Sequence, residues 1–173
     1  MKNRSLIFGI AYSILVILYK LIIILGGYGL SKFGFLFSHI VSVLAIVPFI
    51  FIAIKLTRND LEGYIFGKEA LKTGLRLLVV AAIITSAYNF IEFEWKWKEL
   101  SVTYYNSQAF IEILKSKPKF TADEYPKIIS EAINGLSSFK ATTGKLFVLF
   151  FFGVTASFIS AVFLKKTKTS TQP

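Results

Sequence analysis

The stretch covering residues 66–97 has the profile of a helix that crosses a lipid bilayer. Its middle, residues 77–87, is almost entirely apolar, and Trp95 and Trp97 follow it. Three cations precede this middle: Lys68, Lys72 and Arg76. Cations at one end of an apolar run and tryptophans at the other are typical of a transmembrane helix, whose ends meet the two membrane interfaces. This stretch therefore predicts a span over about residues 71–93.

Three more apolar blocks of similar length occupy residues 5–25, 33–54 and 146–164. Hydrophobic residues make up 54% of the 173 residues, and the mean hydropathy is +0.62. A helix rises about 1.5 Å per residue, so blocks of this length match the hydrocarbon core of a bilayer. We expect an all-α polytopic membrane protein with four transmembrane helices in one domain, residues 1–173. Pro48 predicts an irregularity in the second span.

The first apolar block has a second interpretation, as a cleaved secretory signal. Two features favour a retained helix instead. The apolar run is longer than the roughly 7–15 residues of a signal's hydrophobic region, and no A-x-A-like cleavage site follows it.

Residues 95–145 form the one long polar segment, between the third and fourth spans. We expect one helix over residues 100–115, ended by the Lys117-Pro118-Lys119 sequence. Thr121 and Glu124 form a capping box, although Pro126 favours a later helix start. An apolar stripe at helical spacing follows: Tyr125, Ile128, Ile129, Ala132, Ile133 and Leu136. These amphipathic helices pack on a neighbouring helix or the membrane surface, or they bind a protein partner. Residues 167–173 are expected to be a disordered tail.

The net charge of +10 is best explained by membrane orientation. The cations flank apolar blocks, so we expect anionic lipid, and no nucleic acid, as their partner. With four spans, ten cations share a side with both termini: Lys2, Arg4, Lys55, Arg58, Lys68, Lys72, Arg76, Lys165, Lys166 and Lys168. Nearly all of them adjoin helix ends, where the positive-inside effect acts. Both termini are therefore predicted to be cytoplasmic, in the inner (cytoplasmic) membrane of a bacterium. Lys140 and Lys145 beside the fourth span favour the reverse orientation.

Two short motifs carry a family resemblance. Residues 65–74 read Ile-Phe-Gly-Lys-Glu-Ala-Leu-Lys-Thr-Gly, similar to an "FGEAFKAG"-type start of a third helix, with Lys68 in place of an acid. Residues 86–91 read Ser-Ala-Tyr-Asn-Phe-Ile, similar to an "LYNYI" end of that helix. With these motifs and its layout, the chain resembles a family of bacterial four-span membrane proteins, domain of unknown function 4199. The resemblance implies the four-span fold and implies no activity.

Four polar residues fall at similar depth within the predicted spans: Lys20, His39, Asn89 and Glu92. Ionisable groups inside a membrane are costly and commonly functional. Our hypothesis is an intramembrane polar cluster in which Lys20 pairs with Glu92. Each residue also has a simpler explanation. Lys20 can extend to the interface, Glu92 can pair with Lys96 one turn later, and His39 can bond a nearby backbone group or serine.

Small residues recur every four positions in the fourth span, at Gly153, Ser157 and Ala161. Such spacing lets two helix backbones approach closely. We expect these residues to pack helices within the bundle, and homodimerisation through the fourth span is the alternative.

Motifs for catalysis or cofactor binding are absent from the sequence. There is no cysteine and one histidine, so no cysteine-based or multi-histidine metal site can form. Residues 26–29, Gly-Gly-Tyr-Gly, lack the Lys-Ser/Thr that follows in a phosphate-binding loop. We therefore expect a non-catalytic interaction or accessory component of the membrane, with the lipid bilayer and a protein bound through residues 95–145 as partners. The alternative function is a small transporter or channel subunit that acts as an oligomer.

Overall fold

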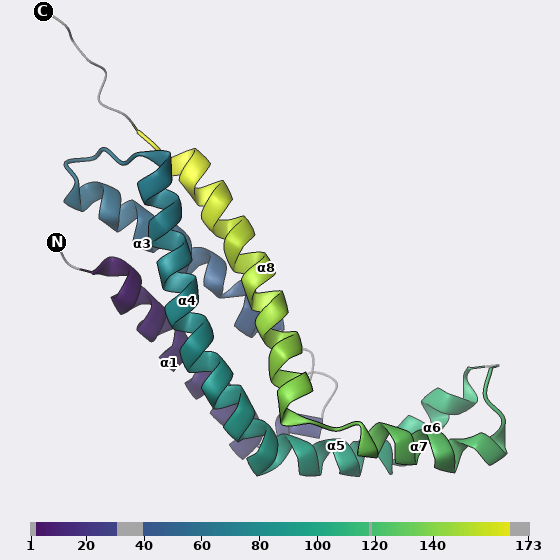
Figure 1. Cartoon of the computed structure of the whole chain (residues 1–173). Helices are drawn as coiled ribbons and strands as arrows, with labels where there is room; N and C mark the ends of the chain where they lie inside the picture. Colours follow the sequence, from purple (N-terminus) through teal and green to yellow (C-terminus); the bar gives the residue numbers. More distant parts are fainter. Residues whose placement is uncertain (1–2, 31–39, 118, 167–173) are drawn as a thin grey trace, which may run out of the picture.

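Four long helices form a bundle, and a smaller helical arm projects from one end of it (Figure 1). The computed structural model describes residues 3–30, 40–117 and 119–166. The long helices are α1 (Arg4–Leu25), a span over Ile40–Asp60 that contains α3 (Ile46–Asp60), α4 (Gly67–Glu92) and α8 (Ser138–Leu164). Each is long and apolar enough to cross a membrane. The predicted all-α, four-span architecture is confirmed.

Three of the helices extend beyond their predicted spans. The second helix continues to Asp60, and α8 begins at Ser138, eight residues before its apolar run. The helix containing α4 begins at Gly67 and continues without interruption to Tyr105. Hydropathy locates the part of a helix that contacts lipid, whereas the hydrogen-bonded backbone continues into water, so sequence alone underestimates helix length.

The irregularity expected at Pro48 lies three residues earlier, at Ala45. Residues 40–44 are helical, Ala45 is a turn residue, and α3 starts at Ile46. Proline lacks the N–H that would bond the carbonyl four residues before it, so Pro48 leaves the Leu44 carbonyl without its helical donor. Pro48 itself lies in the first turn of α3, where a missing N–H has little effect.

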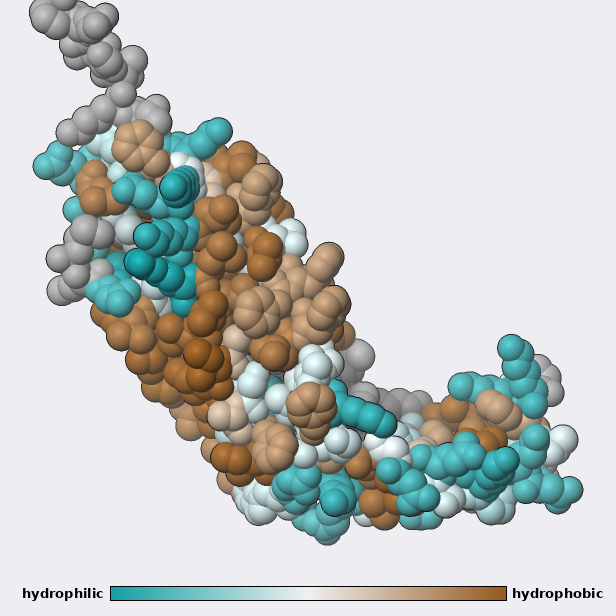
Figure 2. Space-filling model, viewed as in Figure 1, coloured by the Kyte–Doolittle hydropathy of each residue, from teal (hydrophilic) through white to brown (hydrophobic). Residues whose placement is uncertain are grey.

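Helix α4 lies at the centre of the bundle and contacts α1, α3 and α8. Its buried face shares one core with the neighbouring helices, and this core includes Ile46, Ile50, Ile54, Leu77, Leu78 and Ala81, all at 0% exposure. The outward faces are apolar as well, with Ile22, Phe147 and Phe163 more than 60% exposed (Figure 2). A helix bundle that is apolar inside and outside is suited to lipid as its solvent.

Small side chains bring α4 and α8 close together. A Cβ atom added to Gly74 would lie 2.8 Å from Cβ of Ser157, which is closer than two such atoms approach in proteins. Gly153 faces Leu78 in the same interface, and Ala161 is buried one helical turn after Ser157. The structure thus places the small residues of the fourth span inside the bundle.

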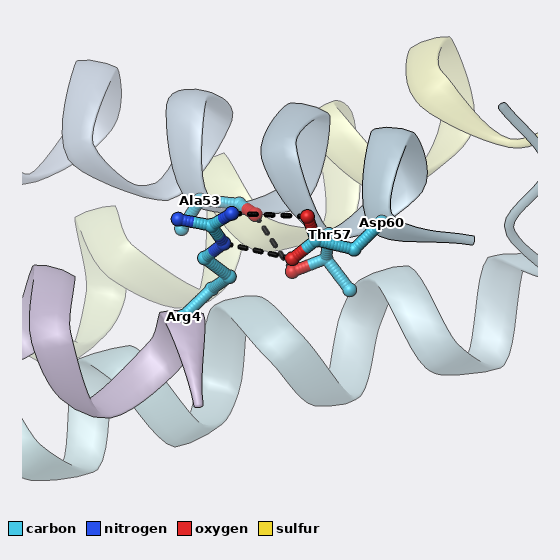
Figure 3. A network of polar contacts seen from close by, with 4 residues as sticks. All are labelled: Arg4, Ala53, Thr57 and Asp60. Atoms are coloured by element: carbon cyan, nitrogen blue, oxygen red, sulfur yellow. Dashed lines mark hydrogen bonds and ion pairs between the residues drawn. The ribbon is translucent and has the colours of Figure 1, made fainter. Parts of the chain in front are cut away.

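The bundle end that carries Arg4 and Lys166, here called the terminal end, is held by polar contacts. Arg4 donates from Nε and Nη2 to the two carboxylate oxygens of Asp60, at 2.8 and 2.9 Å, and so joins α1 to α3 (Figure 3). Thr57, one turn earlier, donates its hydroxyl to the Ala53 carbonyl (Figure 3). Backbone hydrogen bonds of 3.0 Å in both directions pair Ile65 with Lys166. These contacts lie at or near the ends of the second and fourth long helices.

The arm leaves the opposite bundle end, here called the arm end, as a continuation of α4 (Figure 1). A π-helical turn (Phe93–Trp97) leads into α5 (Lys98–Tyr105), which contacts both α6 (Gln108–Lys115) and α7 (Tyr125–Asn134). The π turn leaves a wider backbone loop than an α-helix does, and its Phe93 and Trp97 are buried against Ile24 of α1.

The predicted single helix over residues 100–115 is wrong. The chain turns at Asn106 and Ser107, and the Ser107 hydroxyl accepts a hydrogen bond from the Phe110 N–H at 3.3 Å. Ser107 is therefore an N-cap that starts a second helix, a signal available in the sequence. The capping box at Thr121 and Glu124 is present, and Pro126 lies in the first turn of α7, so the later helix start is confirmed.

Candidate functional site

Four polar side chains from three helices meet inside the bundle near the arm end. They are Lys20 of α1, Asn89 and Glu92 of α4, and Lys145 of α8, here called the polar cluster. Lys20 Nζ lies 2.7 Å from Glu92 Oε2 and also donates to Asn89 Oδ1. Lys145 Nζ lies 3.9 Å from the same Glu92 oxygen. Three of the four predicted residues are thus brought together, and the fourth, His39, lies outside the described residues.

Helical spacing explains how the sequence places these groups. Lys20 lies four and eight residues after Val16 and Tyr12, so it shares the buried face of α1. Asn89 and Glu92 are three apart on α4, and both point toward that face. Lys145 was not among the predicted cluster residues, because it lies outside the predicted fourth span, residues 146–164. In the structure α8 starts at Ser138, seven residues before Lys145, and carries Lys145 into the bundle.

The polar cluster is largely removed from solvent and holds unequal charge. The side chains of Lys20, Glu92 and Lys145 are 5%, 0% and 21% exposed. Buried charges are costly unless they are paired, and here two cations share one carboxylate. Aromatic rings add weaker contacts, since Lys20 Nζ lies 5.6 Å from the Tyr88 ring centre and Lys145 Nζ lies 5.9 Å from that of Trp97.

The simpler explanations for Lys20 and Glu92 do not describe this geometry. Lys20 extends into the bundle rather than to the surface, because its amine bonds Asn89 and Glu92. Lys96 pairs with Glu99 at 2.8 Å and leaves Glu92 to the two buried lysines. The polar cluster is therefore a tertiary contact among α1, α4 and α8.

A cavity of about 330 Å³ adjoins the polar cluster. It lies between α1, residues 40–44, α4 and α8. Its polar lining residues include Lys20, Asn89 and Lys145 from the polar cluster, together with Ser42 and Thr85. Tyr12 also lines it and donates its hydroxyl to the Ser42 carbonyl at 2.5 Å. The rest of the lining is mainly aliphatic or aromatic: Val16, Val43, Leu44, Val148, Leu149 and Phe152. The cavity thus combines one charged end with an apolar body.

The charged groups of this site are two ammonium groups and one carboxylate. In the described ranges, no group of three histidine, cysteine, aspartate or glutamate side chains is close enough to hold a metal ion. The polar cluster offers one carboxylate, and that carboxylate is paired with cations. An ammonium pair beside an apolar cavity suits an anion with an apolar part.

The arm presents a second candidate surface. Within α5, α6 and α7, Leu114 is the one buried residue. The rings of Tyr104, Tyr105 and Phe110 lie with centroids 5.0–5.8 Å apart, and Phe110 packs edge to face with both tyrosines. Three large apolar side chains remain more than a third exposed: Tyr104, Ile113 and Phe120. These three residues, here called the arm surface, are apolar area that the arm's own small core leaves uncovered.

Glu124 helps to cap the short 3-10 turn, Ala122–Glu124, that precedes α7. Its carboxylate accepts from the Thr121 N–H at 2.8 Å and from the Thr121 hydroxyl at 3.0 Å. These bonds to the charged form, the backbone bond first, hold the pKa of Glu124 below its ordinary value.

Comparison with known proteins gives a family and no activity. Residues 5–166 match the family described as protein of unknown function (DUF4199). No curated protein and no solved structure matches the chain.

Proposed function

The chain belongs to the DUF4199 family, and we propose that it is a non-catalytic membrane component that binds another protein through its arm. The arm surface carries this proposal. A helical segment of about 40 residues seldom stabilises itself in water with a single buried side chain, and its exposed aromatic and aliphatic groups are the types enriched in protein interfaces. A partner that covers Tyr104, Ile113 and Phe120 would complete that small core.

Residues 98–134 carry five lysines and five acids, but the stretch between α6 and α7 is basic and supports an acidic partner at that end of the arm. Between Lys115 and Lys127 the arm carries four lysines and two acids, and Glu124 is already engaged by Thr121. Basic and apolar groups side by side favour an acidic protein surface with an apolar centre.

Site-specific photo-crosslinking tests this proposal. A photoreactive residue at Ile113 is expected to yield one discrete crosslinked band when the full chain is expressed in its native membrane. The matched control places the same group at Phe151, which is 63% exposed on the bundle and faces lipid in this proposal. Crosslinks from Phe151 and none from Ile113 would contradict an arm interface.

We also propose that the chain lies in a bacterial inner membrane with both termini in the cytoplasm. The basic residues Lys68, Lys72 and Arg76 lie four apart on the terminal end of α4 and line one groove with Asn3 and Ser5, which supports cytoplasmic exposure of this end. Several arm cations sit further from the spans, where the positive-inside effect is weaker. An alkaline phosphatase fused to the C-terminus is expected to be inactive, and one inserted at Asn106 active. The reverse pattern of activity would show that both termini lie outside the cytoplasm.

A second function, a transporter or channel subunit, is favoured by one observation: buried charges face a cavity inside the bundle. A cavity of about 330 Å³ in one copy does not itself make a path across the membrane, so this function needs an oligomer. A stable homo-oligomer in mild detergent, together with solute flux in liposomes, would support it. Monomers that show no solute flux would contradict the transporter or channel function and would not affect the arm proposal.

A further inference from the structure

We propose that the cavity beside the polar cluster binds an anionic lipid, with its headgroup at Lys145 and Lys20 and the start of an acyl chain along α8. This site is separate from the arm surface and does not depend on the function proposed for the arm.

The charge balance of the polar cluster calls for an anion. Among the described residues, the ion pairs of the buried Lys20 and the partly buried Lys145 go to a single carboxylate, Glu92. Glu92 Oε2 is 2.7 Å from Lys20 and 3.9 Å from Lys145, so the pairing with Lys20 is the closer one. Lys145 is then a largely buried cation with a remote partner, beside a cavity that it lines. One negative charge placed there would neutralise the site.

The position of Lys145 along α8 matches the depth of a lipid headgroup. It directly precedes the apolar run of residues 146–164 and lies over the ring of Trp97, an indole near the end of the α4 span. Tryptophan and snorkelling lysine are both typical of the membrane interface. An anion held by Lys145 would therefore lie level with the lipid headgroups, whichever way the chain crosses the membrane.

The proposal requires the cavity to open toward lipid, and the exposure of several lining residues supports such an opening. Three of its lining residues, Leu44, Val148 and Phe152, are 50%, 42% and 38% exposed on the outside of the bundle. These residues belong to faces that contact acyl chains in a membrane, so a lipid can enter sideways without leaving the bilayer. Pockets for small molecules span about 300–1,000 Å³, so a cavity of about 330 Å³ admits a headgroup and the nearest part of one chain.

Fluorescence quenching by brominated lipids tests the proposal on the full chain. Trp95→Phe leaves Trp97, next to Lys145, as the only tryptophan. In phosphatidylcholine vesicles, a small fraction of brominated phosphatidylglycerol should quench Trp97 more strongly than the same fraction of brominated phosphatidylcholine. In Lys145→Gln this preference should disappear, giving equal quenching by both lipids. In Lys140→Gln, which loses the same charge from an exposed site on the same helix, the preference should remain.

Three results would overturn the proposal. One is equal quenching by both lipids in the unaltered site. Another is an equal loss of preference in the Lys145 and Lys140 variants, which would show general attraction to a basic protein. The third is loss of the preference on adding inorganic phosphate, which would identify a free anion as the ligand.

A second measurement keeps the site intact, in case Lys145→Gln does not fold. Unbrominated phosphatidylglycerol added to the same vesicles should restore Trp97 fluorescence in a saturable manner, while unbrominated phosphatidylcholine should dilute the quencher without saturation. Restoration that is the same for both lipids would exclude a specific site.

Discussion

Lys20 and Glu92 are 72 positions apart in the sequence, yet their charged atoms lie 2.7 Å apart inside the bundle. The contact joins α1 to the last turn of α4, just before the π-helical turn. It is the point where the first long helix, the central helix and the base of the arm meet. Removing either charge is therefore expected to affect more than one helix.

Glu92→Gln should lower the free energy of unfolding by about 3–5 kcal/mol, because it leaves two buried cations without a carboxylate. Unfolding of the purified chain in mild detergent, followed by circular dichroism, measures the change. Glu94→Gln is the control, since Glu94 is 47% exposed and its pairing with Lys98 is at 3.7 Å. Similar losses in both variants would show that the pair has no special weight.

Reversing the pair tests the contact itself. Glu92→Lys alone would place a third cation at the site and should sharply reduce the folded yield. Adding Lys20→Glu pairs a carboxylate at position 20 with the new lysine at position 92. This restores an attractive contact and should recover much of that yield. Yield is measured as the monodisperse fraction in size-exclusion chromatography. A double variant with the same folded yield as Glu92→Lys would show that Lys20 and Glu92 do not form a stabilising pair.

Gly74→Ala should destabilise the bundle by about 1–3 kcal/mol, because the new methyl group would overlap Ser157. Ser157→Gly in the same chain removes the obstructing atoms and should return most of the loss. The control is Gly144→Ala, where no neighbouring atom lies within 4 Å of the new Cβ. Thermal unfolding in detergent compares the three. Stability unchanged in Gly74→Ala would mean that α4 and α8 are further apart than described.

Acid should loosen the 3-10 turn, Ala122–Glu124, that precedes α7. The pKa of Glu124 is lowered in the folded chain by its bonds from Thr121, so the unfolded segment binds the proton more readily. The stabilising effect is complete above the ordinary value of 4.5 and is lost as the pH falls through the lower folded pKa. Hydrogen exchange at the Thr121 amide should accelerate over that acid range relative to its neighbours. In Glu124→Gln the same amide should exchange faster already at neutral pH, with no such acid transition.

The Arg4–Asp60 pair should contribute little and respond to salt. Both side chains are partly exposed, at 24% and 30%, so mobile ions screen their attraction. A double-mutant cycle with Arg4→Gln and Asp60→Asn should give a small coupling at low salt that vanishes at high salt. Coupling that persists at high salt would indicate a contact shielded from water.

The sequence was sufficient for the four spans because lipid imposes a simple rule. Every spanning segment must be a long apolar helix, and hydropathy detects such segments directly. Hydropathy could not locate the start of α8, because its first turns, residues 138–145, are polar and resemble a loop on that measure. The break at Ser107 was readable as an N-cap signal, but the prediction used only the stronger break at Lys117-Pro118-Lys119 and so gave one continuous helix.

The candidate site was predictable in part for a related reason. Lys20, Asn89 and Glu92 interrupt apolar sequence, and a polar residue in such surroundings is conspicuous. Lys145 is not conspicuous, because it borders a polar segment and resembles any flanking lysine. Its inward direction depends on the register of α8 against α4, which Gly74 and Ser157 set by close contact. That register is a tertiary property with no local signature.

The π-helical turn at Phe93–Trp97 has a geometric consequence for the arm. One residue advances an α-helix by about 100°, so the extra residue in this turn sets the direction in which everything after it points. Deleting one residue here would let α4 and α5 join as a regular helix and swing α6 and α7 by about that angle around the α4 axis. The arm would then keep its fold, but its exposed aromatic side would face a different direction around the α4 axis.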